Sequence, residues 1–170
     1  MQKIELELKN STYYKTFKYN YDELINELNQ IDSNYFLANH YDEINTLVSN
    51  FINSFANLLN RIDTKNDNES IFTVNNIFSD EEIEFFNAFR YLANQIKHDL
   101  SLELITMPVI NKSANYSRPY LYGDMPTIEW RNFKNKEKNK HEYRNQYDKY
   151  LKEKSIKTTI EKLYSLVNDI

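Results

Sequence analysis

Apolar residues recur at two different periods along the chain, and each period predicts a different secondary structure. In residues 37–62 they return every three or four positions, which is the spacing of one face of an amphipathic helix. A second helix is expected to begin after Ser79, because Glu82 three positions later completes the capping box that starts many helices. Its apolar face comprises Phe85, Phe86, Phe89, Leu92, Ala93 and Ile96.

Strict alternation of apolar and polar residues predicts strands before these helices. Residues 3–9 alternate throughout, with isoleucine and leucine on one side and charged residues on the other. A turn signal follows, and residues 12–19 are rich in the residue types that strands favour. We therefore expect residues 1–19 to form an N-terminal hairpin.

A second β region is expected after the helices. Residues 100–105 alternate again, and residues 115–133 predict a hairpin. Its tip is Gly123-Asp124, the arrangement that a type II′ turn requires. These segments predict a small antiparallel sheet attached to the helices.

Two more helices complete the expected fold, one at residues 21–31 and a long one at residues 136–169. No internal repeat or linker divides the chain, so the sequence predicts one domain over residues 1–170. The expected class is mainly α (α+β), a three- to four-helix bundle with a small antiparallel β-sheet formed by hairpins. Its parts are the hairpin 1–19, the helical core 21–99, the strand and hairpin 100–133 and the C-terminal helix 136–169.

The composition excludes several classes of function. The chain has no cysteine, which excludes thiolate metal sites and cysteine nucleophiles and suits a reducing cytoplasm. Gly123 is the single glycine, so the glycine-rich phosphate loops of nucleotide-binding enzymes are excluded as well. No apolar run is long enough to span a bilayer and no signal segment is evident. We expect a cytoplasmic protein without a membrane partner.

The net charge of −4 conceals one basic segment, because residues 131–157 hold ten Lys/Arg and only four Asp/Glu. In its first half the cations alternate with aromatic residues, a pattern that suits RNA: cations neutralise phosphates and rings stack on exposed bases. The simpler interpretation is a solvated start of the last helix. The expected nucleic-acid-binding residues are Arg131, Lys134, Lys136, Lys138, Lys140 and Arg144.

Residues 89–99 hold the most informative candidate chemistry. Arg90, Asn94 and His98 stand at i, i+4 and i+8, which places them with Lys97 along one side of the expected helix, away from its apolar face. Asn87 and Tyr91 are expected beside this row. An imidazole transfers protons near neutral pH, a guanidinium or ammonium stabilises a phosphate, and the amide of Asn94 orients them. This set suffices for RNA cleavage without a metal, because the 2′-hydroxyl of RNA is itself the nucleophile.

The segment Asn94-Gln95-Ile96-Lys97-His98-Asp99, preceded by Arg90, resembles the signature of the HEPN superfamily, which includes abortive-infection proteins and toxin ribonucleases. The resemblance covers about 20 residues and assigns the family's histidine to His98, its polar companion to Asn94 and its arginine to Arg90. It implies a bacterial or mobile-element defence or toxin protein that acts on RNA. It also implies a homodimer whose two copies form a cofactor-free ribonuclease site, and an antitoxin as a further partner.

Other interpretations of the same residues stay open. They also fit an inactive HEPN-like binding module, or a solvated helix face ending in a histidine that favours the C-terminal dipole. A function of another class is a non-enzymatic interaction or inhibitor protein, for example phage-encoded, that binds a protein or nucleoprotein complex. It would use the basic segment and exposed tyrosines, since tyrosine is enriched at interfaces: Tyr13, Tyr19, Tyr116, Tyr120 and Tyr122.

Metal-dependent chemistry is not expected. Asp124, Glu129 and Arg131 weakly resemble the D…E-x-K pattern of metal-dependent nucleases, but arginine replaces the lysine and loses its adjustable amine. His40 is close to Glu43 without a third ligand, and His141 is isolated. We therefore predict no metal site.

Overall fold

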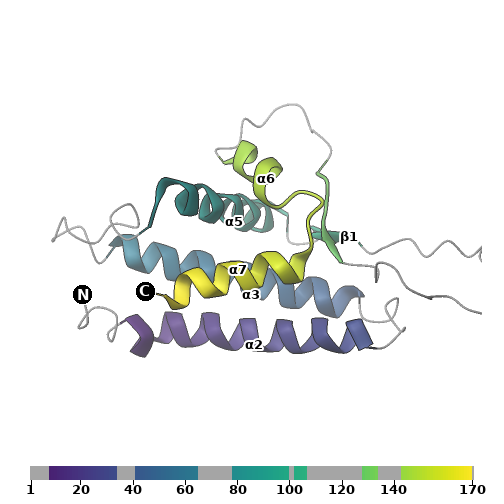
Figure 1. Ribbon diagram of the computed structural model, residues 1–170, viewed down its shortest axis with the longest axis horizontal. Helices are drawn as coiled ribbons and strands as arrows, with labels where there is room; N and C mark the ends of the chain where they lie inside the picture. The colour runs from purple at the N-terminus through teal and green to yellow at the C-terminus, as the bar shows by residue number, and fades with distance from the viewer. Residues whose placement is uncertain are drawn as a thin grey trace, which may run out of the picture.

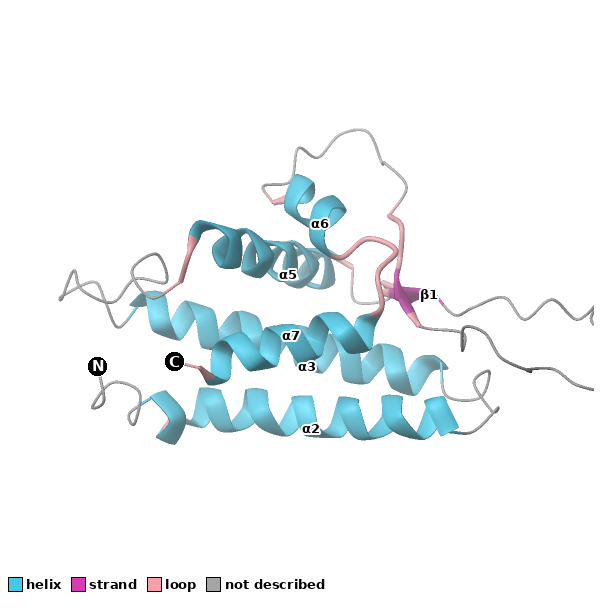
Figure 2. Ribbon diagram, viewed as in Figure 1, coloured by secondary structure: helices cyan, strands magenta, loops and turns pink. Residues whose placement is uncertain are grey.

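Four helices lie side by side and alternate in direction (Figure 1). They are α2 (Thr12–Ser33), α3 (Tyr41–Thr64), α5 (Asp80–His98) and α7 (Ile156–Asn168). The computed structural model describes residues 8–33, 41–64, 78–99, 102–106, 128–133 and 143–169. The short helix α6 (Arg144–Tyr150) packs on α5, and a two-stranded sheet lies at one end of the helices (Figure 2). The expected class, a mainly helical bundle with a small antiparallel sheet, is confirmed.

Aromatic rings occupy the centre of the bundle. Phe55 of α3 is fully buried, and its ring centroid lies 5.8 Å from Phe17 of α2, 5.5 Å from Phe86 and 5.8 Å from Phe89 of α5. Such tilted and edge-to-face contacts add to the free energy of apolar burial. One side chain of α3 therefore joins both neighbouring helices, and the period expected from residues 37–62 is confirmed over the described residues 41–62.

The expected N-terminal hairpin is wrong, because residues 12–19 form the first turns of α2. Residues 1–7 lie outside the described residues, and residues 8–10 are helical. The turn signal before residue 12 is a helix cap, since the backbone N–H of Tyr14 donates to Ser11 Oγ at 3.2 Å. Tyr14 and Phe17 are buried three residues apart, so the helical period determines the structure although the residue types favour a strand. The helix expected at residues 21–31 is confirmed as part of α2.

The long C-terminal helix is also wrong, because the chain breaks between α6 and α7. Glu153 has a positive φ of 57°, and its N–H donates to the carbonyl oxygen of Trp130 at 3.1 Å. Ser155 then caps α7 by accepting from the N–H of Thr158 at 3.4 Å. The backbone groups freed by the break are thus bonded to the sheet and to the cap.

The sheet pairs β1 (Ile105–Thr106) with β2 (Glu129–Trp130) in antiparallel register, Ile105 opposite Trp130. Of the expected strand 100–105, residue 105 lies in β1, residues 102–104 precede it, and residues 100 and 101 lie outside the described residues. The tip of the expected hairpin 115–133 falls outside the described residues. Trp130 is fully buried, and its indole N–H donates to Thr159 Oγ1 at 2.7 Å, which joins β2 to α7.

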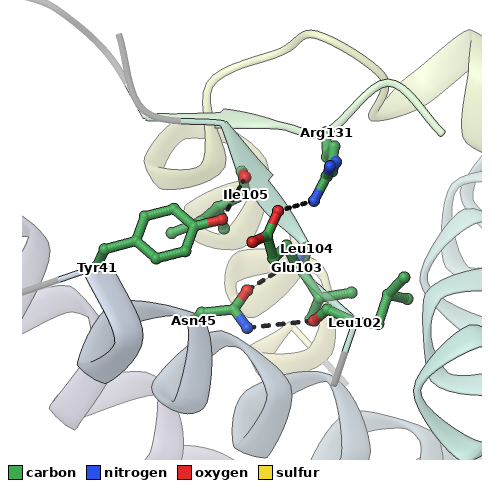
Figure 3. Close-up of polar contacts among 7 residues, drawn as sticks. All are labelled: Tyr41, Asn45, Leu102, Glu103, Leu104, Ile105 and Arg131. Atoms are coloured by element: carbon green, nitrogen blue, oxygen red, sulfur yellow. Dashed lines mark hydrogen bonds and ion pairs between the residues drawn. The ribbon is translucent and has the colours of Figure 1, made fainter. Parts of the chain in front are cut away.

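The segment leading into β1 is held against α3 by two side chains (Figure 3). The amide of Asn45 donates to the carbonyl oxygen of Leu102 at 3.2 Å and accepts from the N–H of Leu104 at 2.8 Å, as a neighbouring strand would. One turn earlier, the Tyr41 hydroxyl donates to the carbonyl oxygen of Ile105 at 3.2 Å. These bonds determine how the chain leaves α5 toward the sheet.

Candidate functional site on helix α5

Helix α5 carries the candidate residues, and a complete capping box fixes its start. Glu82 Oε2 accepts from the backbone N–H and the hydroxyl of Ser79, each at 2.7 Å, and the Glu82 N–H donates back to Ser79 Oγ at 3.4 Å. The bonds from Ser79 hold the pKa of the Glu82 carboxyl below its usual value. The predicted helix start is confirmed.

The helix separates an apolar side from a polar strip. All six residues of the expected apolar face are buried, and Ala88 and Tyr91 are buried with them. Arg90 and Asn94 are half-buried, whereas Lys97 and His98 are exposed. We call these last four residues the polar strip. The structure therefore brings the four sequence-predicted catalytic residues onto the side of α5 that faces away from the core.

The spacing of these residues along α5 limits which of them can act together within one chain. Arg90 and His98 stand eight residues apart, or about 12 Å along the axis, with Asn94 midway between them. Because helical side chains lean toward the N-terminus, this spacing favours contact between His98 and Asn94 over contact between His98 and Arg90. Within one chain, His98 and Asn94 are neighbours, while Arg90 is one further turn away.

His98 is the last residue of α5, at the end where the helix carries partial negative charge. The next residue, Asp99, has extended backbone, and its N–H closes the helix by donating to the carbonyl oxygen of Gln95. The imidazole is therefore displayed at the junction between α5 and the segment that Asn45 holds.

Tyr91, expected beside the polar strip, turns inward instead. Its ring packs 5.0 Å from that of Tyr147 and 6.3 Å from that of Phe133, and its hydroxyl accepts from Arg144 Nη1 at 2.8 Å. A second guanidinium N–H of Arg144 donates to the carbonyl oxygen of Phe133 at 2.8 Å, and its Nε donates to Asp148 at 3.0 Å. We call Tyr91, Phe133, Arg144 and Tyr147 the arginine cluster.

The two described arginines of the expected RNA-binding segment are thus bonded within the chain. Arg144 is enclosed in the arginine cluster, with 23% of its side chain exposed. Arg131 forms an exposed ion pair with Glu103 beside β1 (Figure 3). The four expected lysines, Lys134, Lys136, Lys138 and Lys140, lie outside the described residues.

Sequence reasoning missed the arginine cluster, although one signal for it was present. Tyr143 and Tyr147 stand four residues apart around Arg144, so one turn of α6 places Tyr147 near the guanidinium. Burial raises the pKa of the Tyr147 hydroxyl far above its usual value, which keeps it neutral as a donor to the carbonyl oxygen of Arg131. This cluster joins α5, α6 and the residues that follow β2.

Other sequence candidates gain little from the structure. Glu129 lies in β2, Asp124 lies outside the described residues, and so do His40 and His141. Among the residues that the structure describes, no group of three or more His, Asp or Glu side chains could hold a metal ion. No helix in the same residues is both long and apolar enough to cross a membrane.

Comparisons of the chain with protein-family models, with curated proteins and with solved structures find no match. The assignment to the HEPN superfamily therefore stays a prediction from residues 90–99. The geometry of α5 is the main structural support for a function.

Proposed function

We propose that this chain is a HEPN-like, metal-independent endoribonuclease that acts on RNA in the cytoplasm of a bacterium, in a defence or toxin system. The observation that carries the proposal is the polar strip. A capped helix, packed on its other side by buried rings, displays an imidazole, an amide and two cations along one line. Residues on rigid helices are well suited to hold reacting groups in position.

The reaction follows from these groups. His98 accepts the proton of an RNA 2′-hydroxyl, whose oxygen attacks the adjacent phosphorus. The bond from phosphorus to the 5′-oxygen breaks, the 5′-oxygen takes a proton from a protonated imidazole, and the products are a 2′,3′-cyclic phosphate and a 5′-hydroxyl. Arg90, helped by Lys97, stabilises the charge that develops on the phosphate oxygens. Asn94 orients the imidazole.

Two copies of the chain complete the site in this proposal. Arg90 and His98 each stand four positions from Asn94, on opposite sides of it. If two α5 helices cross antiparallel with a two-fold axis near Asn94, Arg90 of one copy comes opposite His98 of the second copy. This arrangement removes the separation of about 12 Å within one strip and yields two equivalent sites.

Mixing two inactive variants tests this proposal. Arg90→Ala and His98→Ala are each expected to lose RNA cleavage by about 10²-fold or more. When equal amounts are unfolded together and refolded, half of the dimers pair one of each variant, and each of those has one intact site. About a quarter of the wild-type cleavage should return.

The control mixes Arg90→Ala with the double variant Arg90→Ala/His98→Ala, which leaves no intact site in any dimer. Cleavage that returns equally in the control would show that it does not come from a shared site. If His98→Ala cleaves RNA as well as the wild type does, the ribonuclease proposal is rejected.

A second candidate is the interaction or inhibitor protein, which the exposed tyrosines of α2 favour. Tyr13 is 45% exposed and Tyr19 is 62% exposed, whereas most aromatic rings among the described residues are buried. The guanidinium of Arg61 lies 5.9 Å from the Tyr13 ring, so an arginine and a tyrosine adjoin there, two residue types enriched at interfaces. Loss of a co-purifying protein on Tyr13→Ser/Tyr19→Ser, with cleavage unchanged, would support this role.

A further inference from the structure

Three exposed lysines converge on two adjoining aromatic rings away from the polar strip. Lys149 Nζ lies 4.6 Å and Lys154 Nζ 5.9 Å from the Tyr150 ring centroid, and Lys162 Nζ lies 4.7 Å from that of Phe85. The two rings meet edge to face at 5.8 Å. We call Lys149, Lys154 and Lys162 the lysine triad. Its members come from α6, from the α6–α7 connection and from α7.

The rings hold the ammonium groups in place while leaving them charged. Tyr150 and Phe85 are buried, and the three lysines whose Nζ atoms lie over these rings are exposed to solvent. Lys154 Nζ is fixed further by donating to the carbonyl oxygen of Lys149 at 2.6 Å. Less side-chain entropy is therefore lost when an anion binds here than on freely rotating lysines.

Carboxylates neutralise only part of this charge. Glu84 Oε2 accepts from Lys149 Nζ at 2.7 Å and from the Tyr150 hydroxyl at 2.8 Å, and 61% of the Lys149 side chain stays exposed. Glu82 is near enough to Lys162 for its pKa to be lowered slightly by it, but its oxygen is bonded to Ser79. Three cations therefore face one directly bonded carboxylate.

We propose that the lysine triad is a sequence-independent contact for the phosphate backbone of single-stranded RNA. The inference rests on the proposed action on RNA and names where the substrate binds outside the polar strip. Because the rings are buried under the lysines, they cannot stack on bases, so only the charged backbone is recognised. Lysine suits this contact, since it binds phosphate as a point charge without a fixed geometry.

The position of the triad favours a strand over a small anion. The triad borders Phe85 near the start of α5, and His98 ends the same helix about 20 Å away. A single strand of several nucleotides spans that distance and carries a charge at each step. A contact so far from the reacting phosphate would raise affinity without entering the chemistry.

The test measures the affinity of the full chain for labelled oligouridine at several salt concentrations. Each phosphate contact to a single strand contributes about 0.7 to the slope of log affinity against log salt, so Lys149→Gln/Lys154→Gln/Lys162→Gln should reduce its magnitude by about 2. The arginine triple at the same positions keeps the charge and should keep the slope. The matched control is Lys9→Gln/Lys15→Gln/Lys18→Gln, which removes three lysines from the N-terminal region. It should leave the slope almost unchanged, because α2 lies on the opposite side of the bundle from α6 (Figure 1).

The outcomes separate this inference from the proposed ribonuclease. His98→Ala should keep the salt slope and lose cleavage. If the wild-type chain binds RNA through the triad but does not cleave it, the ribonuclease proposal is rejected and the inference about the triad stands. An unchanged slope in the glutamine triple, its fold verified by circular dichroism, overturns the inference even if cleavage is present. Polyglutamate binding that requires the triad, with no such slope change for RNA, would instead identify an acidic protein as the partner and overturn it too.

Discussion

Cations border two sides of α5 and serve opposite purposes. On the side that α6 covers, Arg144 of α6 donates to the Tyr91 hydroxyl, the Phe133 carbonyl oxygen and Asp148. On the outward side, Lys97 and His98 end the helix in solvent. A cation enclosed by rings and bonded to the chain stabilises the fold, whereas one displayed by a rigid helix is available to a ligand. Under the proposed function, position and not residue type separates the cation that stabilises the fold from the cations that act on a ligand.

The largest loss of stability is expected from Arg144→Ala. Its guanidinium bonds are charge-assisted, and their removal leaves the Tyr91 hydroxyl and a carbonyl oxygen without their donor in a partly buried site. The free energy of unfolding should fall by about 2–3 kcal/mol, measured by urea denaturation. Arg144→Lys should recover less than half of the loss, because an ammonium cannot reach both acceptors in the planar geometry of a guanidinium. Equal stability of Arg144→Ala and the wild type would show that the arginine cluster is not structural.

Tyr91→Phe isolates one bond of the cluster and should cost about 1 kcal/mol. The ring stays, so its packing on Tyr147 and Phe133 is preserved and only the hydroxyl acceptor is lost. In the double variant with Arg144→Ala, the total loss of stability should be smaller than the sum of the two single losses, because both substitutions remove the same bond. Full additivity would mean that the hydroxyl and the guanidinium act independently.

The capping box of Ser79 and Glu82 stabilises the start of α5, and its contribution to the free energy of unfolding depends on pH. Ser79→Ala should lower the free energy of unfolding by about 1 kcal/mol at neutral pH. Since the folded-state pKa of Glu82 is depressed, its contribution is present above the unfolded-state value of 4.5 and is lost as the pH falls through the lower folded-state value. Below pH 4.5 the cost of Ser79→Ala should therefore shrink. Glu82→Gln is the control, since it should remove this part of the pH dependence; an unchanged pH profile would contradict the assignment.

The sequence predicts one side of α5 far better than the other. Arg90, Asn94 and His98 share a strip because of helix geometry alone, so their spacing is sufficient to place them. The contact between Arg144 and Tyr91 joins residues 53 positions apart and requires the packing of α6 on α5, which no local pattern contains. Tyr91 was expected beside the strip because the helical period of α5 gives its angular position but does not show that α6 covers that side.

The errors elsewhere have related causes. Residues 12–19 combine strand-favouring side chains with a helical period, and burial of Tyr14 and Phe17 against α3 and α7 decides between them. The break before α7 has no glycine or proline to mark it. Glu153 adopts its positive φ where bonds to Trp130 compensate for the strain, so the break depends on a sheet that forms elsewhere in the chain.

The smallest change in stability is expected where the change in activity is largest, and His98→Ala tests this. The imidazole is exposed at the end of α5, so its removal should alter the free energy of unfolding by less than about 0.5 kcal/mol. Cleavage of RNA should nevertheless fall by about 10²-fold or more, because no other side chain on the polar strip transfers protons near neutral pH. Lys97→Ala is the matched control, since it is exposed one residue earlier and lacks that chemistry; it should change stability as little and cleavage far less. A His98→Ala variant that lost stability as Arg144→Ala does would place its imidazole among the structural groups, and the contrast between the two sides of α5 would no longer hold.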